Sequence, residues 1–146
     1  MYGYVKVGSA VPKLRVADCV YNKEEILKLV EAAAAKQVRV LSFPELSVTG
    51  YTCADLFFQT PLLHAAEQAI QEIAEATEAL NIFLLIGAPI AVDNQMFNCA
   101  VALYKGKLLG IVPKTHIPNY SEFYEERWFA SADDLLTEEI TYAGQN

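Results

Sequence analysis

No polar side chain interrupts the stretch from Ile82 to Ile90, and this stretch restricts the possible folds more than any other feature. The run is too short to span a membrane, which takes about 20 apolar residues in a helix. A strand without apolar-polar alternation is typical of a sheet that is covered on both faces. Asp93-Asn94 then supplies a turn. The sequence therefore predicts a buried central strand.

Helix and strand patterns alternate along the rest of the chain, and no linker-like or repetitive segment divides it, so we expect a single domain. The patterns predict helices at about 22–36 and 61–80 and strands at 4–11, 38–43, 82–90, 96–104 and 108–112. Asn22 is the expected N-cap of the first helix. Residues 138–143 resemble the start of a further strand. The order β-α-β-α-β-β-β indicates an α/β fold with helices stacked on one side of a mixed sheet.

Charge and cysteine content restrict the partners and the compartment. A net charge of −7 and a pI of about 4.8 disfavour binding to nucleic acid or to an anionic membrane, so a small-molecule or protein partner is expected. The widely spaced Cys19, Cys53 and Cys99 form no CxxC pair, and no histidine cluster accompanies them. We therefore expect no metal site and a reducing, cytoplasmic setting.

A carboxylate follows the second predicted strand. Pro44 ends that strand, and Glu45 comes directly after it among apolar neighbours. Partial burial raises the pKa of a carboxyl group and a nearby ammonium opposes this, so Glu45 is a candidate general base. The alternative is an ordinary loop glutamate that caps Ser47 or Thr49.

A lysine follows the last predicted strand in the same manner. Lys114 stands between Pro113 and a second proline-bounded turn. An ammonium beside a carboxylate can stabilise the oxyanion of an acyl-transfer reaction, whereas a surface salt bridge is the alternative. His116 is a lone histidine for which packing is a more ordinary role than catalysis.

Aromatic and charged residues are dense between Ser121 and Phe129. Such a segment can wall a small-molecule pocket, or it can simply cover the core as a loop. Composition does not decide between the two.

Taken together, these segments resemble the nitrilase (carbon–nitrogen hydrolase) superfamily in order and spacing. The resemblance rests on residues 43–46, 49–51, 106–107, 113–118 and 125–129. Within the superfamily, residues 10–19, 50–57 and 119–125 are similar to the amidase domain of the bacterial glutamine-dependent NAD synthetases. This resemblance covers essentially the whole chain.

The resemblance implies a Glu-Lys-Cys site for hydrolysis of L-glutamine. Glu45 matches the general base, Lys114 the lysine that stabilises the tetrahedral intermediate, and Glu125 a supporting glutamate. Tyr120 and Phe123 match positions that contact the substrate. The implied fold is a four-layer αββα sandwich in a homo-oligomer. The glutaminase domain itself needs no cofactor or metal, and ATP and deamido-NAD are expected only at a separate synthetase domain.

The sequence departs from the family at the nucleophile, because no cysteine follows Lys114. Cys53 imitates the nucleophile's context but precedes Lys114, so a partly buried loop thiol is the favoured reading. We therefore expect residues 1–146 to form only the N-terminal half of the sandwich, without the C-terminal half or the synthetase domain, and to be inactive alone. The alternatives are a piece of another nitrilase-family amidase or carbamoyl hydrolase, and a non-catalytic binding or assembly module.

Overall fold

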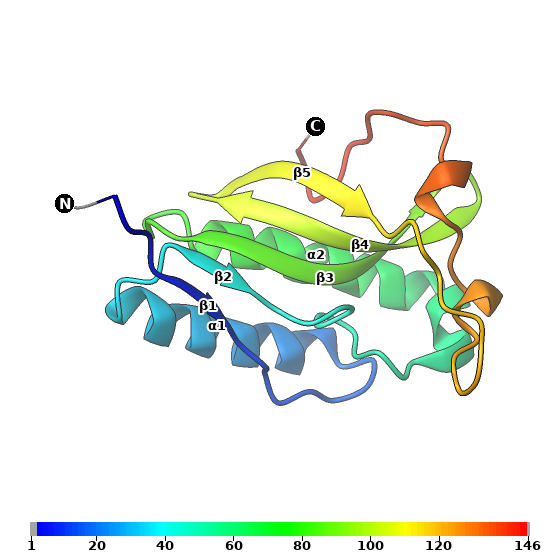
Figure 1. Cartoon of the computed structure of the whole chain (residues 1–146), viewed down its shortest axis with the longest axis horizontal. Helices are drawn as coiled ribbons and strands as arrows, with labels where there is room; N and C mark the ends of the chain where they lie inside the picture. Colours follow the sequence, from blue (N-terminus) through cyan, green and yellow to red (C-terminus); the bar gives the residue numbers. More distant parts are fainter. Residues whose placement is uncertain (1–2, 146) are drawn as a thin grey trace.

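The computed structural model describes residues 3–145 and contains one five-stranded mixed sheet in the order β1-β2-β3-β4-β5 (Figure 1). The main elements are β1 (Val7–Ser9), α1 (Cys19–Ala35), β2 (Val40–Ser42), α2 (Thr60–Ala76), β3 (Phe83–Val92), β4 (Gln95–Tyr104) and β5 (Lys107–Pro113). Three 3₁₀ helices, η1 (Ala54–Phe58), η2 (Glu125–Arg127) and η3 (Ala132–Asp134), lie in the connecting segments. The predicted order of helices and strands is confirmed.

The strand pairing follows from the lengths of the connections. β1, β2 and β3 are parallel, and the helices α1 and α2 form the two crossovers between them. β3, β4 and β5 are antiparallel and joined by tight turns. Asp93 and Asn94 have φ of 52° and 65°, and Lys105 and Gly106 have φ of 50° and 75°. Two successive positive φ angles give the turn that matches the natural twist of a hairpin.

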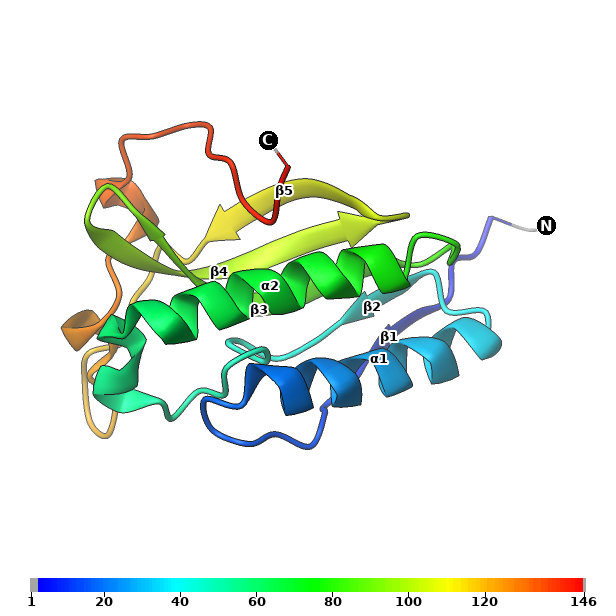
Figure 2. The same ribbon diagram turned by 180° about the vertical axis from the view of Figure 1, so that it is seen from behind.

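Both long helices cover the same face of the sheet, as Figure 2 shows from behind. Alternate residues of the central strand, Leu84, Ile86 and Ala88, are fully buried beneath them, because successive side chains of a strand point to opposite faces. The other face is more exposed, with Ala100 and Val112 open to solvent. The chain thus forms one helix layer and one sheet layer, which is the expected arrangement with helices on one side.

The first helix begins earlier than the sequence suggested. Asp18, not Asn22, is the N-cap, and its carboxylate accepts a hydrogen bond from the Tyr21 N–H. Asn22 lies inside the helix and is fully buried. Its side chain accepts from Arg15 N (2.8 Å) and donates to Arg15 O and Val48 O (both 2.9 Å). The predicted cap at Asn22 is therefore wrong, because its side chain is used for tertiary contacts with Arg15 and Val48.

The predicted strand at residues 138–143 is wrong. Tyr142 pairs only with Gln145, across a turn in which Ala143 and Gly144 have φ of 51° and 71°. The Gln145 side chain accepts from Leu108 N (2.9 Å) and donates to Gly106 O (3.0 Å). This amide holds the segment against the β4–β5 hairpin, an interaction that the local sequence pattern does not contain.

Replacement of Asn22 tests whether its buried amide holds the helix to the loops beside it. Asn22→Ala leaves Arg15 N–H and the Val48 carbonyl without partners, although the Arg15 carbonyl still accepts from Asp18 N–H, so we expect the free energy of unfolding to fall by about 2–4 kcal/mol. Urea denaturation monitored by circular dichroism measures this. Asn119→Ala, at an exposed asparagine that bonds only to Glu126, is the matched control and should change stability by less than about 0.5 kcal/mol. Equal losses in both variants would contradict this role of Asn22.

Candidate active site

A tight turn directly after β2 presents Glu45. The N–H groups of Thr49 and Gly50 both bond to the Leu46 carbonyl, and Leu46 and Gly50 have φ of 51° and 87°. Leu46 and Val48 are fully buried and anchor the turn in the core. The Glu45 side chain points the other way and is 50% exposed. The fold therefore fixes the backbone of this residue while leaving its carboxylate accessible.

Gly87 of β3 allows this turn to lie directly on the sheet. A Cβ at position 87 would meet Leu46 N at 2.3 Å, Pro44 O at 2.5 Å and the carbonyl carbon of Glu45 at 2.7 Å. The turn is also bonded to β3, through Phe43 N to Leu85 O (2.9 Å) and Val48 N to Gly87 O (3.2 Å). Only glycine leaves room for backbone to pack on backbone here, so Gly87 determines where Glu45 lies.

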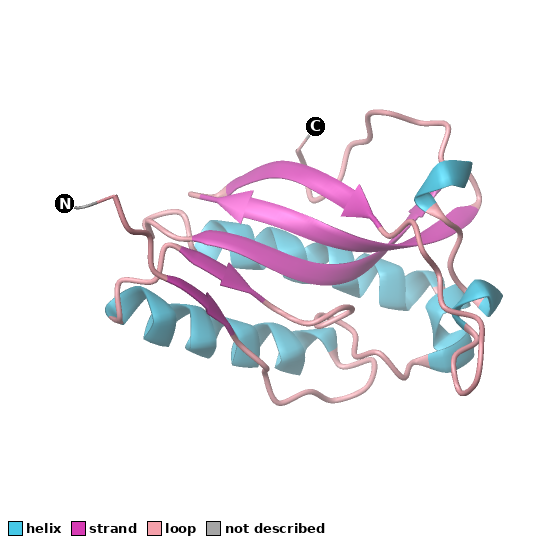
Figure 3. Cartoon of the chain, viewed as in Figure 1, coloured by secondary structure: helices cyan, strands magenta, loops and turns pink. Residues whose placement is uncertain are grey.

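Lys114 reaches the same place from the end of β5. Since β5 and β2 run in the same direction, their carboxyl ends meet at one edge of the sheet, which is the right-hand end in Figure 3. The Lys114 ammonium donates to Glu45 Oε2 (2.9 Å) and to Glu125 Oε2 (3.1 Å). The structure therefore brings together the three residues predicted to be catalytic. Glu45 caps neither Ser47 nor Thr49, whose hydroxyls bond to backbone carbonyls.

Glu125 is the buried member of this group, with a side chain only 4% exposed. It lies at the start of η2, and its N–H donates to Pro118 O (3.2 Å). Its carboxylate accepts from Lys114 and, at the other oxygen, from the Tyr51 hydroxyl. A buried carboxylate requires such partners, because burial without them is costly.

Hydrogen bonds within the cluster keep the Lys114 side chain charged and the Tyr51 hydroxyl neutral. Burial alone would lower the pKa of Lys114, but its hydrogen bonds to Glu45 and Glu125 outweigh this and raise it. Burial, and then the hydrogen bond to Glu125, raise the pKa of Tyr51 well above its usual value. At neutral pH Lys114 is therefore an ammonium and Tyr51 a neutral hydroxyl donor.

A hollow of about 510 Å³ opens beside the cluster. Tyr120 and Phe123 form one wall, with ring centroids 5.9 Å apart in an edge-on arrangement. All five residues predicted for the site line this hollow, together with Pro44, Tyr51 and Pro118. His116 is exposed and does not line it. Segments that are far apart in the sequence thus form one concave, partly aromatic and charged surface, which suits a small polar substrate.

The aromatic segment is fixed by a clamp to η1. Arg127 donates two hydrogen bonds of 2.8 Å to Asp55, and the Trp128 indole donates a third of 3.0 Å. These donors, Arg127 first, lower the pKa of Asp55. Phe129 is buried and packs edge-on against Phe57, with ring centroids 5.0 Å apart. The segment from Ser121 to Phe129 therefore does both things considered for it, because it walls the hollow and also covers the core.

Sequence reasoning missed the roles of Tyr51 and Asn98. Tyr51 belongs to a segment used only for resemblance, yet its hydroxyl bonds to Glu125. Asn98 is 3% exposed, and its amide donates to Glu45 Oε2 (2.9 Å). A signal for Asn98 was present, because a polar amide interrupts the apolar residues Phe97 and Cys99 of a buried strand and must find a partner there.

None of the three cysteines offers a nucleophile to this cluster. Cys19, Cys53 and Cys99 are all buried and free, and none lines the hollow that Tyr120 and Phe123 form. Cys99 is among the residues around a separate hollow of about 290 Å³ that includes Glu45 and Lys114, but its side chain is only 3% exposed. Burial raises the pKa of Cys19 to about 11, that of Cys99 to about 12, and that of Cys53 as well. The Cys53 thiol lies within hydrogen-bonding distance of Thr49 O (3.2 Å), and at 2% exposed the residue is more deeply buried than the partly buried loop thiol that was expected.

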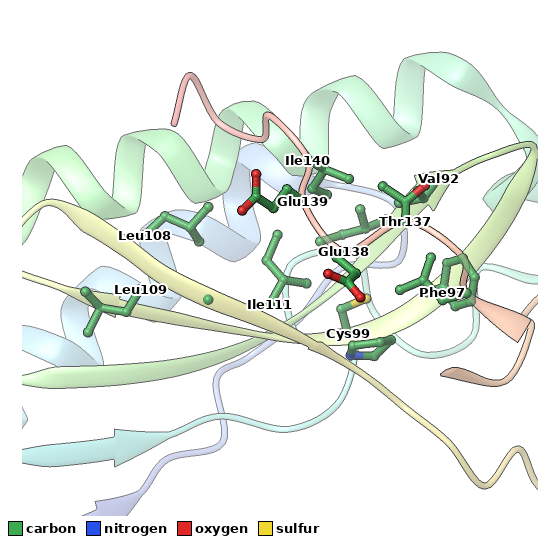
Figure 4. A pocket seen from close by; sticks show the side chains of 14 residues that line it. Val92, Phe97, Cys99, Leu108, Leu109, Ile111, Thr137, Glu138, Glu139 and Ile140 are labelled. Carbon is green, nitrogen blue, oxygen red and sulfur yellow. The ribbon is translucent and has the colours of Figure 1, made fainter. Parts of the chain in front are cut away.

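A second, more apolar cavity of about 370 Å³ lies against β4 and β5 (Figure 4), on the face of these strands opposite to the one from which the Asn98 side chain projects. Phe97, Cys99 and Ile111 line it, whereas the site uses Asn98 from the alternate positions. Residues 135–140 close it from outside, with Glu138 and Glu139 at its edge. It contains neither Lys114 nor the carboxylates of the site.

Within residues 3–145, no group of three His, Cys, Asp or Glu side chains could hold a metal ion. The described helices include none long and apolar enough to cross a membrane.

The family description for carbon–nitrogen hydrolases matches residues 6–144. The chain belongs to the carbon–nitrogen hydrolase family. The predicted resemblance to this superfamily is thereby confirmed, and the cluster of Glu45, Lys114 and Glu125 lies within the matched region.

Several relatives of this carbon–nitrogen hydrolase are much longer than the chain. The glutamine-dependent NAD(+) synthetase of Mycobacterium leprae is 36% identical over 132 residues, which are 90% of this chain and 19% of that protein. The synthetase of Aquifex aeolicus is 34% identical over 125 residues, or 86% of this chain and 22% of that protein. The chain thus spans about a fifth of the length of these relatives.

Solved structures give the same result for the fold. A glutamine-dependent NAD(+) synthetase from Cytophaga hutchinsonii superposes with a TM-score of 0.82 at 30% identity, over 87% of this chain and 22% of that one. An amidase from Nesterenkonia sp. superposes with a TM-score of 0.69 at 21% identity, over 85% of this chain and 47% of that one. The nitrilase-type fold is therefore confirmed, and the helix and sheet layers described above are a part of it.

Gly87→Ala tests the backbone packing that positions Glu45. The new methyl group has no room beside Pro44 and Leu46, so we expect the free energy of unfolding to fall by about 2–3 kcal/mol. Chemical denaturation measures this. Gly110→Ala is the matched control in β5 of the same sheet, because a Cβ there meets nothing within 4 Å. If Gly87→Ala is as stable as Gly110→Ala, the turn does not depend on Gly87.

Thiol titration tests whether the cysteines are inert. At pH 8 a thiol with a pKa of about 11 or 12 is almost entirely protonated, and burial also excludes the reagent. With Ellman's reagent we expect fewer than one equivalent to react within minutes in the native chain. In urea all three cysteines should react. Rapid reaction of a native thiol would show that one of them is available for chemistry.

Proposed function

We propose that this chain supplies the general base and the ammonium of a glutaminase site in a glutamine-dependent NAD synthetase. The observation that carries the proposal is the contact of the Lys114 ammonium with Glu45 and Glu125 beside an aromatic hollow. The names of the relatives described above supply the substrate, glutamine, and the overall reaction, NAD synthesis. They also favour this branch over a stand-alone amidase, since the NAD synthetase structure superposes better and is more similar in sequence.

The proposed chemistry begins with a thiol that none of the three buried cysteines provides, so it comes from sequence outside these 146 residues. Glu45 takes the thiol proton, and the thiolate forms a C–S bond to the side-chain amide carbon of glutamine. The Lys114 ammonium stabilises the oxyanion of the tetrahedral intermediate. The C–N bond then breaks, and ammonia leaves with the proton returned by Glu45.

Water completes the cycle. Glu45 accepts a proton from a water molecule as the oxygen attacks the thioester, the C–S bond breaks, and glutamate leaves while the thiol is re-formed. Glu125 holds Lys114 during both half-reactions through its hydrogen bond with the ammonium, and the Tyr51 hydroxyl in turn holds Glu125, so the far wall of the hollow is left for the substrate. Tyr120 and Phe123 would contact the glutamine side chain from that wall.

The proposal extends to cofactors, partners and location. Hydrolysis of glutamine by this group of residues requires no cofactor, and ATP and deamido-NAD would bind only at a synthetase domain. A homo-oligomer agrees with the exposed apolar residues on the face of the sheet that the helices leave open, such as Val112. A cytoplasmic location agrees with three free cysteines, because the cytosol keeps thiols reduced.

Substitutions in the protein encoded by the complete gene that carries this chain test the function. We expect that protein to release glutamate from glutamine and to make NAD from deamido-NAD, ATP and glutamine. Lys114→Ala and Glu45→Gln should each lower kcat for glutamate release by about 10²–10³, as for loss of an oxyanion donor or a base. NAD synthesis from added ammonia should remain, because it bypasses this site.

The controls are Lys107→Ala and Glu122→Gln, which change exposed residues outside the hollow and should keep kcat within about twofold. The 146-residue chain alone should release no glutamate. Turnover by the chain alone, or full activity of the Lys114→Ala protein, would disprove the assigned roles.

A further inference from the structure

Asn98 differs from Asn22, the other buried asparagine within residues 3–145, in what its side chain binds. It is 3% exposed and lies in β4, opposite Pro89 of β3. The buried Asn22 bonds only to backbone groups, as a structural amide does. Asn98 Nδ2 instead donates to the Glu45 carboxylate, which is half exposed and is the proposed general base.

Asn98 also contacts the other half of the site. Its backbone carbonyl accepts the Lys114 N–H at 2.8 Å, so one residue of β4 binds both the Glu45 side chain and the Lys114 backbone. The two segments are 69 positions apart in the sequence. β4 is the strand between β3, on which the Glu45 turn lies, and β5, from which Lys114 emerges.

The contacts distinguish the two oxygens of Glu45. Oε2 accepts from Asn98 Nδ2 (2.9 Å) and from Lys114 Nζ (2.9 Å). From residues 3–145, Oε1 receives no hydrogen bond. Two donors on one oxygen fix the rotation of the carboxylate more firmly than one donor, and they leave the other oxygen free to accept a proton.

We propose that Asn98 is a positioning residue that holds Glu45 by Oε2, so that Oε1 is the atom that takes the proton of the attacking thiol. This inference rests on the proposed function for the role of Glu45. An amide suits the task because it does not titrate and remains a donor whether or not Glu45 carries the proton. A second ammonium in its place would compete with Lys114 for the same oxygen.

The position of Asn98 predicts which kinetic constant it affects. It lines a separate hollow of about 290 Å³ beside Glu45 and Lys114 and not the one that Tyr120 and Phe123 form, so its loss should leave the proposed contacts of the aromatic wall with the substrate intact. A base displaced by a fraction of an ångström to about 1 Å slows proton transfer by up to about 10²-fold. We therefore expect a change in kcat and not in KM.

Kinetic measurements on the protein encoded by the complete gene test the predicted effect of Asn98 on kcat. Asn98→Leu keeps the approximate size and removes the donor, and Asn98→Ala removes the side chain. Both should lower kcat for glutamate release by about 10- to 100-fold, with KM within about twofold. Val101→Ala, which is buried in the same strand on the helix side, is the control for general destabilisation and should keep kcat. A kcat within twofold of the Val101→Ala protein in both variants would overturn the proposal.

Nuclear magnetic resonance of the 146-residue chain tests the contact separately from activity. The Asn98 side-chain NH₂ pair is identified by its absence in Asn98→Leu. Glu45→Gln replaces the carboxylate that accepts this hydrogen bond and should change the chemical shift of the pair, whereas Glu122→Gln should not. A shift that is the same in Glu45→Gln shows that Asn98 does not hold Glu45.

The two measurements separate the two hypotheses. If the complete protein does not hydrolyse glutamine, the proposed function fails, and the role of Asn98 in proton transfer fails with it even where resonance data show the contact. If the complete protein is active and the Asn98 variants retain kcat, only the inference about Asn98 fails.

Discussion

Two carboxylates from distant segments approach a single ammonium at one edge of the sheet, and the arrangement of the surrounding loops depends on this contact. Glu125 is almost fully buried and would be costly there without its bonds to Lys114 and Tyr51. Glu45 is half exposed and less dependent on the ion pair for stability. The same ammonium therefore has two roles, since it neutralises the buried Glu125 and holds the accessible Glu45. Truncation of Lys114 would leave the buried Glu125 carboxylate without its ammonium partner, which destabilises the fold. It would also release the Glu45 carboxylate, which the proposed chemistry needs in a fixed position.

The sequence was sufficient for those features that depend on periodicity or on a boundary between elements. The order of the elements followed from alternating apolar patterns, and Pro44 and Pro113 marked the strand ends where Glu45 and Lys114 were expected. Parallel direction then explains why the two residues meet, because β2 and β5 point to the same edge of the sheet. Resemblance to a known family supplied Glu125, Tyr120 and Phe123, and geometry places them around the same hollow.

Other features depend on contacts between distant segments, which no local pattern encodes. Asp18 and Asn22 are both good capping residues, and the choice between them rests on the bonds of Asn22 to Arg15 and Val48. The need for glycine at position 87 comes from a turn about 40 residues earlier in the chain that rests on it. Residues 138–143 have the composition of a strand, yet the Gln145 side chain holds the segment on a hairpin instead. Propensity describes what a segment can form, and tertiary contacts select among the options.

The candidate site is built from two kinds of support, and the difference bears on how it works. Glu45 and Lys114 are held by backbone packing on Gly87 and by Asn98, on strands at the centre of the fold. The aromatic wall is instead carried by a loop that is tied to η1 through the exposed Asp55–Arg127 pair. An exposed ion pair contributes little to stability and is screened by salt, whereas buried backbone packing is not. The groups assigned to bond making and breaking are thus held by buried contacts, whereas the ion pair that ties the groups assigned to substrate contact is exposed and weaker, which suits a site where catalysis needs fixed geometry and binding must admit and release a small molecule.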